Sequence, residues 1–210
     1  MTSPTNDLSP AHRRGPRHAA ASPRKAHWLR ELVIVVVVAV VVAVLLRIFV
    51  VQTFTIPSGS MMPTLDIGDR IVVDKLAYDL HGVGRGDIVV FARPPGEDCA
   101  GPPVADLVKR VIGLPGETIS LSKNGDVLIN GKQLDETWLP ESQQGTTYPG
   151  PSQNAYSLGQ PYKIPANHYF MMGDNRGDSC DSRFWGPIPK SLMVGKADLR
   201  IWPLSRFHFF

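Results

Sequence analysis

The stretch LVIVVVVAVVVAVLLRIFVV, residues 32–51, decides how this chain is organised. Every residue from Leu32 to Leu46 is Leu, Val, Ile or Ala, and Arg47 is the only charge in the stretch. As a helix, these residues would span roughly 30 Å, the thickness of a bilayer's hydrocarbon core. Arg47 lies near one end, where its long side chain can reach the headgroups. The stretch therefore predicts a membrane anchor.

A cleaved secretory signal is the alternative interpretation of this stretch. Such signals have an apolar core of about 7–15 residues, followed by a cleavage site with small residues. The run here is longer, and Gln52-Thr53-Phe54-Thr55 offers no such site, although Ser58-Gly59-Ser60 has small residues at its ends. We therefore expect an uncleaved transmembrane anchor over residues 31–51.

The charges on either side of the anchor predict its orientation. Residues 1–30 hold six basic side chains against one acid, Asp7, and lack apolar periodicity. Because positive flanks remain inside, these residues are expected to form a disordered cytoplasmic tail. Residues 52–210 would then be an extracytoplasmic domain at the plasma membrane. After residue 30 there are 16 basic and 18 acidic residues, so no basic excess suits a nucleic acid.

Short apolar runs separated by turn signals follow the anchor. The 19 glycines and 19 prolines favour strands and turns over a helical bundle. Asn124-Gly125 and Asn130-Gly131 are hairpin dipeptides, because glycine accepts the positive φ of a tight turn. Residues 139–165 show little periodicity and are expected to form a surface excursion. Run length and β-branched content predict strands over residues 71–78, 87–92, 107–112, 117–121, 126–129, 168–172 and 194–202.

Candidate nucleophiles follow the anchor in IPSGSMMPTL, residues 56–65. Proline and glycine give this segment an extended, turned backbone from which serine hydroxyls project. A serine becomes a nucleophile only beside a base. Histidine is the usual base, but none of the six carries the local signature of a Ser-His-Asp triad. Three are in the expected cytoplasmic tail and three in the domain: His12, His18 and His27, then His81, His168 and His208.

Lysine is the other candidate base. The segment LVKRVIGLPGE, residues 107–117, places Lys109 and Arg110 on opposite faces of an apolar strand. A lysine base must be neutral, so working near pH 8 requires its pKa to fall about 2–3 units below the ordinary value, which burial can supply. Arginine cannot be deprotonated there, so chemistry selects Lys109. A charge that protects an edge strand from aggregation explains the same pattern without catalysis.

A third segment, GDNRGDSCDSRFWG at residues 173–186, is dense in turn residues and in charges of both signs. Alone, it is typical of a salt-bridged surface loop or of a support that orients a base. The runs SGSMMPTL, KRVIGLPGE and GDNRGDSCDSRFWG together resemble the signature boxes of type I signal peptidases, in that family's order and after an N-terminal anchor. The resemblance covers about residues 32–121 and 166–202.

This resemblance implies a membrane-bound serine endopeptidase that removes signal peptides from exported preproteins through an acyl-enzyme, without metal or organic cofactor. Ser60 would be the nucleophile and Lys109 the general base, while Ser58 and the Ser60 backbone N–H would hold the oxyanion. Ser179 would hydrogen-bond the lysine amine. The other supporting residues would be Arg110, Asp174, Asp181 and Arg183. Apolar pockets for small residues before the cut would be walled by Ile56, Pro57, Met61, Leu65, Leu107 and Val108.

The implied fold is mainly β, two antiparallel sheets in a signal-peptidase-like catalytic domain with one transmembrane helix. The accessory region, about residues 122–165, is short and should be reduced to hairpins and loop. Expected partners are signal peptides, membrane lipid and a nearby secretion translocon. The alternatives are a non-catalytic, membrane-tethered β-domain that binds envelope partners, and a self-cleaving serine–lysine protease of the repressor type. Cys99 and Cys180 would either pair or stay as two thiols.

Overall fold

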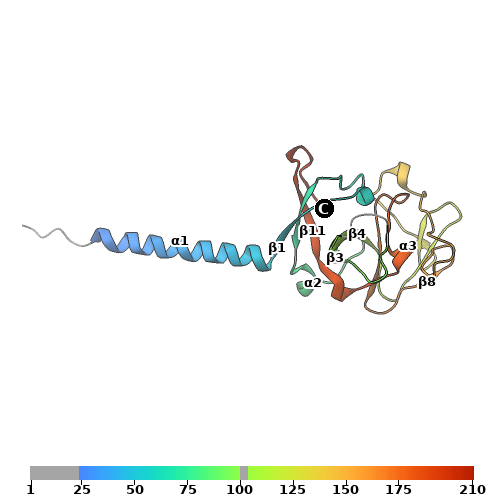
Figure 1. Ribbon diagram of the computed structural model, residues 1–210, viewed down its shortest axis with the longest axis horizontal. Helices are drawn as coiled ribbons and strands as arrows, with labels where there is room; N and C mark the ends of the chain where they lie inside the picture. The colour runs from blue at the N-terminus through green and yellow to red at the C-terminus, as the bar shows by residue number, and fades with distance from the viewer. Residues whose placement is uncertain (1–23, 100–103) are drawn as a thin grey trace, which may run out of the picture. The chain divides into compact units, whose positions relative to one another are not determined.

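The computed structural model describes residues 24–99 and 104–210, which divide into an N-terminal helix and a β-rich body (Figure 1). Helix α1 (Arg24–Phe49) is apolar and long enough to cross a membrane, and its side chains are exposed from Trp28 to Leu45. The expected tail lies outside the described residues up to residue 23, whereas its last part, residues 24–30, belongs to α1.

The body is built from strands and short helical turns, and its longest strand is the last but one. Its short α-helices are α2 (Ala77–Leu80) and α3 (Ser182–Trp185). Its strands are β1 (Val51–Thr55), β2 (Arg70–Asp74), β3 (Ile88–Ala92), β4 (Asp106–Gly113), β5 (Thr118–Leu121), β6 (Val127–Ile129), β7 (Lys132–Gln133), β8 (Tyr162–Lys163), β9 (His168–Met172), β10 (Ile188–Pro189), β11 (Met193–Trp202) and β12 (His208–Phe209).

These strands form two antiparallel sheets. The larger sheet has the order β1-β2-β11-β3-β4-β9-β10, and β12 pairs with β11. The smaller sheet has the order β7-β6-β5-β8. Strand β4 lies inside the larger sheet between β3 and β9, so its backbone is hydrogen-bonded on both sides and its side chains have fixed directions. The mainly antiparallel β-fold with an apolar N-terminal helix is confirmed.

Two predicted boundaries were wrong: the end of one strand and the end of the anchor. The strand expected over residues 71–78 ends at Asp74, whose carboxylate accepts a hydrogen bond of 2.8 Å from the Leu76 N–H. This turn, formed by an aspartate side chain, stops the strand and starts the turn of α2. The anchor was expected to reach Val51, but that residue opens β1 and pairs with Asp74.

Residues 122–165 hold the β6–β7 hairpin and a long segment with a single 3-10 turn, and they are not confined to the surface. Asn130 (φ 50°) and Gly131 (φ 78°) form the tight turn between β6 and β7. In the expected excursion, Leu158 and Ile164 are each 1% exposed and pack with Phe170 of β9. The prediction failed because the apolar residues that turn inward are isolated in the sequence and do not form a periodic run.

Candidate active site

Ser60 is presented by a single 3-10 turn, Gly59–Met61, that follows β1. Met61 on one side of the turn is 1% exposed, and Ile56 before it is 3% exposed. Both belong to the core cluster beneath the site. The turn is therefore held by its buried neighbours, while the Ser60 hydroxyl faces a cleft.

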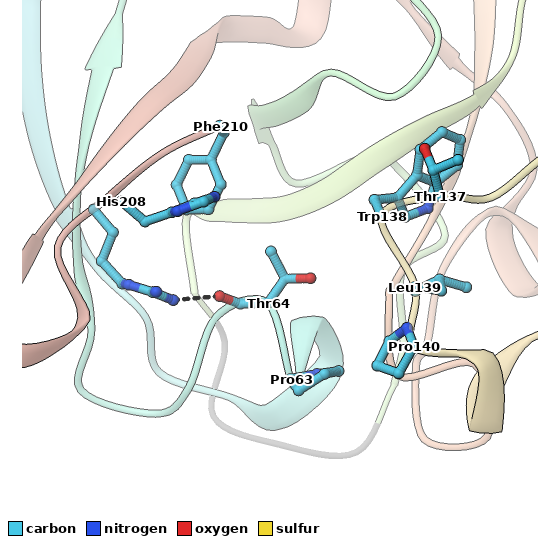
Figure 2. Close-up of a pocket in the computed structure, with 9 residues that line it drawn as sticks. Pro63, Thr64, Thr137, Trp138, Leu139, Pro140, His208 and Phe210 are labelled. Atoms are coloured by element: carbon cyan, nitrogen blue, oxygen red, sulfur yellow. Dashed lines mark hydrogen bonds between the residues drawn. The ribbon is translucent and has the colours of Figure 1, made fainter.

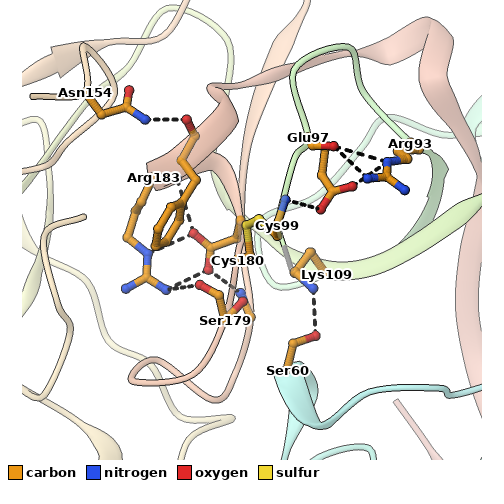
Figure 3. Close-up of a disulfide and its surroundings, with 12 residues drawn as sticks. Ser60, Arg93, Glu97, Cys99, Lys109, Asn154, Ser179, Cys180 and Arg183 are labelled. Atoms are coloured by element: carbon orange, nitrogen blue, oxygen red, sulfur yellow. Dashed lines mark hydrogen bonds and ion pairs between the residues drawn. A yellow bond between two sulfur atoms is a disulfide. The ribbon is translucent and has the colours of Figure 1, made fainter. Parts of the chain in front are cut away.

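Lys109 comes from the middle of β4, opposite Val89 of β3. Its Nζ lies 2.7 Å from the Ser60 Oγ, and the two groups are hydrogen-bonded (Figure 3). Only 4% of the lysine is exposed. The two residues are far apart in the sequence, so the sheet brings together the nucleophile and base that the sequence predicted.

Burial is the main cause that lowers the pKa of Lys109 from 10.5 to about 8, because the charged amine loses its water. Arg183 lowers this pKa as well. The carboxylates of Asp181, Glu97 and Asp174 act in the opposite direction and raise it. At mildly alkaline pH the Lys109 amine is thus neutral in a large fraction of the protein molecules, as a general base requires.

Ser58 precedes the 3-10 turn and lines the same cleft. Its Oγ lies 3.5 Å from the Ser60 Oγ, which is long for a hydrogen bond between hydroxyls. Ser58 is exposed, so its hydroxyl is free to rotate toward a bound substrate. The hydroxyls of Ser58 and Ser60 therefore lie side by side at the cleft.

Asp181 and Arg183 form a buried pair at the start of α3. The Arg183 Nε and Nη2 donate to the two Asp181 oxygens at 2.8 and 2.7 Å. Burial raises the pKa of Asp181, but Arg183 and the Gly173 N–H, 3.0 Å away, outweigh it and bring this pKa below its ordinary value. The pair links the end of β9 to α3 with both charges satisfied.

Arg110 points to the other face of β4, where it meets Asp174. Its Nε and Nη2 donate to the carboxylate at 2.8 and 2.6 Å. The Thr64 hydroxyl donates to the same carboxylate at 2.5 Å, which links it to the segment after Ser60. The predicted alternation is confirmed, but both faces of β4 are buried, and the arginine is the cation that receives a carboxylate partner.

Ser179 does not make the expected hydrogen bond to the lysine amine. Its hydroxyl is buried and has no hydrogen-bond partner in the described part of the chain. It lies against the backbone of Gly173, where it and the Ser60 carbonyl oxygen fill the space that a side chain would need. The geometry therefore gives Ser179 a packing position beside Ser60.

Three supporting contacts were missed by the sequence analysis. The Asn175 backbone N–H donates to the Ser60 carbonyl, and its side-chain amide donates to the Gly59 carbonyl, each at 3.1 Å. Arg176, 2% exposed, pairs with the buried Glu136 of the accessory region. Asn175 lay in a segment already singled out, but Glu136 carries no local signal, because its partner is distant in sequence.

The cleft around Ser60 and Lys109 has a volume of about 550 Å³. Five of the six expected pocket residues line it: Ile56, Pro57, Met61, Leu107 and Val108. Leu65 is instead fully enclosed in the core beneath the turn, where it supports Met61. The cleft is also lined by charged residues that were not expected there: Arg93, Glu97, Asp106 and Asp178.

A second cavity of about 390 Å³ shares no lining residue with this cleft (Figure 2). It lies between Pro63, Trp138 and the C-terminal Phe210, and Arg200 donates to the Thr64 carbonyl at its edge. His208 lines this cavity. Among the described residues no histidine lines the cleft that holds Ser60, so the geometry gives no support to a Ser-His-Asp site.

The two cysteines are paired, and the bridge lies beside the site. Cys99 and Cys180 form a disulfide with Cα atoms 6.2 Å apart (Figure 3). Both residues line the cleft. The bridge joins the segment after β3 to the loop that carries Ser179 and Asp181.

A serine beside a buried lysine, in an apolar cleft of an antiparallel β-fold, fits a serine endopeptidase. The family model described as "Signal peptidase, peptidase S26" matches residues 29–202. The chain is 38% identical to signal peptidase I of Leptolyngbya laminosa over 205 residues, which cover 97% of this chain and 92% of the relative. It therefore belongs to the signal peptidase family, peptidase S26.

Two further comparisons concern the same family. The chain is 39% identical to signal peptidase I of Bacillus caldolyticus over 167 residues, which cover 78% of this chain and 86% of the relative. A crystal structure of a signal peptidase I from Enterococcus faecalis V583 matches with a TM-score of 0.39 and 28% identity, and covers 55% of this chain and 97% of that one.

The close approach at Gly173 leads to a first prediction. A Cβ there would overlap the Ser60 carbonyl and the Ser179 hydroxyl, so Gly173→Ala must displace Ser60. Because a 1 Å misplacement can cost about 100-fold in rate, we expect a loss of activity of roughly that size, measured on a leader peptide. Gly177→Ala in the same loop meets nothing within 4 Å and is the matched control. Equal activities of the two variants would contradict this account.

Proposed function

We propose that Ser60 and Lys109 carry out signal-peptide removal in this serine endopeptidase, through an acyl-enzyme. The observation that carries the proposal is the 2.7 Å contact between the serine hydroxyl and a buried amine whose pKa is lowered to about 8. In the described residues Lys109 has no ion-pair partner. Burial of a purely structural lysine would destabilise the fold and bring no benefit. A lysine that acts as a base becomes more reactive when it is buried, because its amine is then neutral.

The geometry supports a complete sequence of proton transfers. The neutral Lys109 amine accepts the Ser60 proton as Oγ attacks the carbonyl carbon at the cut. The Ser58 hydroxyl and the Ser60 N–H donate to the oxyanion. The Lys109 ammonium returns its proton to the leaving amine, which is the new N-terminus of the mature protein. A water then attacks the ester, with the amine again as base, and frees the signal peptide and Ser60.

The cleft also supports a preference for small residues before the cut. Its apolar walls come from short segments that lie close to Ser60, and Met61 and Ile56 are themselves packed into the core. Such walls give a shallow, fixed floor that cannot move away from a large side chain. The substrates we propose are exported preproteins whose signal peptides end in small side chains.

Exposed apolar side chains on the body support work at a membrane surface. Near the C-terminus, β11, a 3-10 turn at Leu204–Arg206 and β12 present four of them to solvent: Trp202, Leu204, Phe207 and Phe209. Aromatic side chains favour the level of lipid headgroups. Together with α1 they fit a single-pass protein of the plasma membrane, with a cytoplasmic N-terminus and an extracytoplasmic catalytic domain close to the secretion translocon.

Replacement of the nucleophile is the direct test. Ser60→Ala should reduce leader-peptide cleavage by several orders of magnitude and leave the thermal midpoint almost unchanged, because only one half-buried hydroxyl is removed. Ser191→Ala, at an exposed site in the turn Lys190–Leu192, is the control and should keep full activity. A Ser60→Ala enzyme with a tenth of normal activity would place the nucleophile elsewhere, first at Ser58.

The base is tested by charge and by pH. The rate should rise as pH passes through about 8, where Lys109 loses its proton. Lys109→Arg keeps the positive charge but cannot accept a proton, so turnover should vanish. Lys75→Arg is the control, because Lys75 follows β2, away from the cleft, and its replacement should not matter. An active Lys109→Arg enzyme, or a flat profile from pH 6 to 9, would overturn the serine–lysine mechanism.

Lys109→Met separates catalysis from folding in the same experiment. Between pH 8 and 10.5 the unfolded chain binds more protons at this position than the folded one, so the lysine destabilises the fold below pH 8. The methionine variant should therefore be inactive yet more stable at pH 7, by an amount on the order of 3 kcal/mol. Denaturant unfolding at pH 7 and pH 10 measures this difference.

The proposed orientation can be tested on intact cells. An added protease should digest the domain after Val51, because it would lie outside, and should spare an epitope placed in the basic N-terminal segment. Lysed cells provide the control, because both parts should then be cut. A protected domain together with a digested tail would show the opposite topology. This result would contradict the proposed location of the domain and of its substrates.

A further inference from the structure

The segment after β3, residues 93–99, forms what we call the arm, and three of its residues line the cleft: Arg93, Glu97 and Cys99. The Arg93 guanidinium pairs with the Glu97 carboxylate and also donates to the Glu97 carbonyl, at 2.7 Å from Nη2. The same carboxylate accepts the Cys99 N–H at 3.3 Å. Only 8% of the Glu97 side chain is exposed. The arm thus holds one carboxylate in a fixed, largely dry position.

The disulfide is the covalent tie between this arm and the catalytic loop. Cys180 lies between Ser179 and Asp181, and its bridge to Cys99 ends the arm. A Glu97 carboxylate oxygen and the two sulfur atoms all lie within 4.8 Å of one another. Arg93, Glu97 and both cysteines line the cleft that holds Ser60 and Lys109 (Figure 3). The bridge therefore fixes where the Glu97 charge stands relative to the cleft.

The charged groups that shift the pKa of Lys109 come from three parts of the body. Asp181 and Arg183 belong to the loop and helix after β9, and each satisfies the other. Asp174, just after β9, is bound by Arg110 on the far face of β4. Glu97 is the one carboxylate among them that comes from outside the three sequence boxes and is placed by the disulfide.

We propose that Glu97 is a positioning residue for Lys109 and that the Cys99–Cys180 disulfide holds it in that role. This inference rests on Lys109 being the base. When Lys109 takes the Ser60 proton it becomes an ammonium in a dry site, and a fixed carboxylate nearby stabilises that charge as it forms. Among the carboxylates that raise the pKa of Lys109, Glu97 is second only to Asp181. Without it the amine is a weaker base.

The test is the pH profile of Glu97→Gln, an uncharged variant of the same size. Loss of the carboxylate lowers the pKa of Lys109, and the Arg93 charge left behind acts in the same direction. The rising limb should move to lower pH by roughly half a unit to one unit, because the weaker base is deprotonated earlier. The plateau at high pH should fall by roughly 2- to 5-fold, because proton transfer to a weaker base is slower.

Glu117→Gln is the matched control. Glu117 is also paired with an arginine, Arg85, and also accepts a backbone N–H, from Leu114, but it is not among the groups that act on Lys109. Its loss costs the same kinds of contact, so it reports what a structural disturbance does. The midpoint of its profile should equal that of the unmodified protein.

The role of the disulfide is tested in a cycle with Glu97→Gln. Cys99→Ser/Cys180→Ser should move the rising limb in the same direction as Glu97→Gln when Glu97 is present, because the arm is released. In the Glu97→Gln background it should cause no further shift. Thermal unfolding tests whether each variant is folded. If the double serine variant does not fold, Glu97→Gln, which keeps the bridge, still tests the role of Glu97.

Each outcome has one meaning. An unchanged midpoint in Glu97→Gln, with the bridge confirmed by mass of the non-reduced protein, overturns the role of Glu97. Equal shifts by bridge removal in both backgrounds overturn the role of the disulfide. An active Lys109→Arg enzyme overturns the serine–lysine mechanism itself, whereas an inactive one together with an unshifted Glu97→Gln removes only this inference.

Discussion

A buried amine without a carboxylate of its own is the constraint on which the rest of this structure depends. Lys109 is 4% exposed, and the described residues give it a serine hydroxyl as a close partner but no ion pair. Burial that lowers its pKa from 10.5 to about 8 costs the fold stability at neutral pH. That cost is tolerable only inside a rigid sheet, because a mobile lysine would simply move its charge to water. Hence β4 is hydrogen-bonded on both sides, between β3 and β9.

The neighbouring charges follow from the same constraint. A carboxylate in contact with Lys109 would hold its proton, so the nearby carboxylates need cations of their own. Asp181 has Arg183 and Asp174 has Arg110, both in two-point contacts. Each pair is satisfied internally, so each can stiffen the loop after β9 and still leave the lysine free to titrate. The alternation of β4 makes this arrangement available, because the side chains of the adjacent residues Lys109 and Arg110 point to opposite faces.

The sequence allowed prediction of those features that are determined by residues close together in the chain. Strands β4 and β9 were predicted because apolar, β-branched runs leave a mark in the sequence, and Lys109 was chosen because arginine cannot act as a base. The supporting residues came from resemblance. What was missed depends on contacts between distant segments: Glu136 with Arg176, and Asn175 with Ser60. The burial of Leu158 and Ile164 was missed for a related reason. A single apolar residue gives no periodic pattern, so its burial is recognised only from its packing in the folded chain.

In our proposal the arm formed by residues 93–99 adjusts the site without touching Ser60 or Lys109. Hydrogen bonds alone would hold such a surface segment weakly, because water competes for each of them. A disulfide does not face that competition, and it persists in the extracytoplasmic space where we place this domain. The disulfide therefore ties the arm to the loop that carries Asp181. It also restricts where the Glu97 charge can lie relative to that loop. Under this proposal the basicity of Lys109 would depend on the compartment, because the disulfide that would position one of its nearby carboxylates persists outside the cytoplasm.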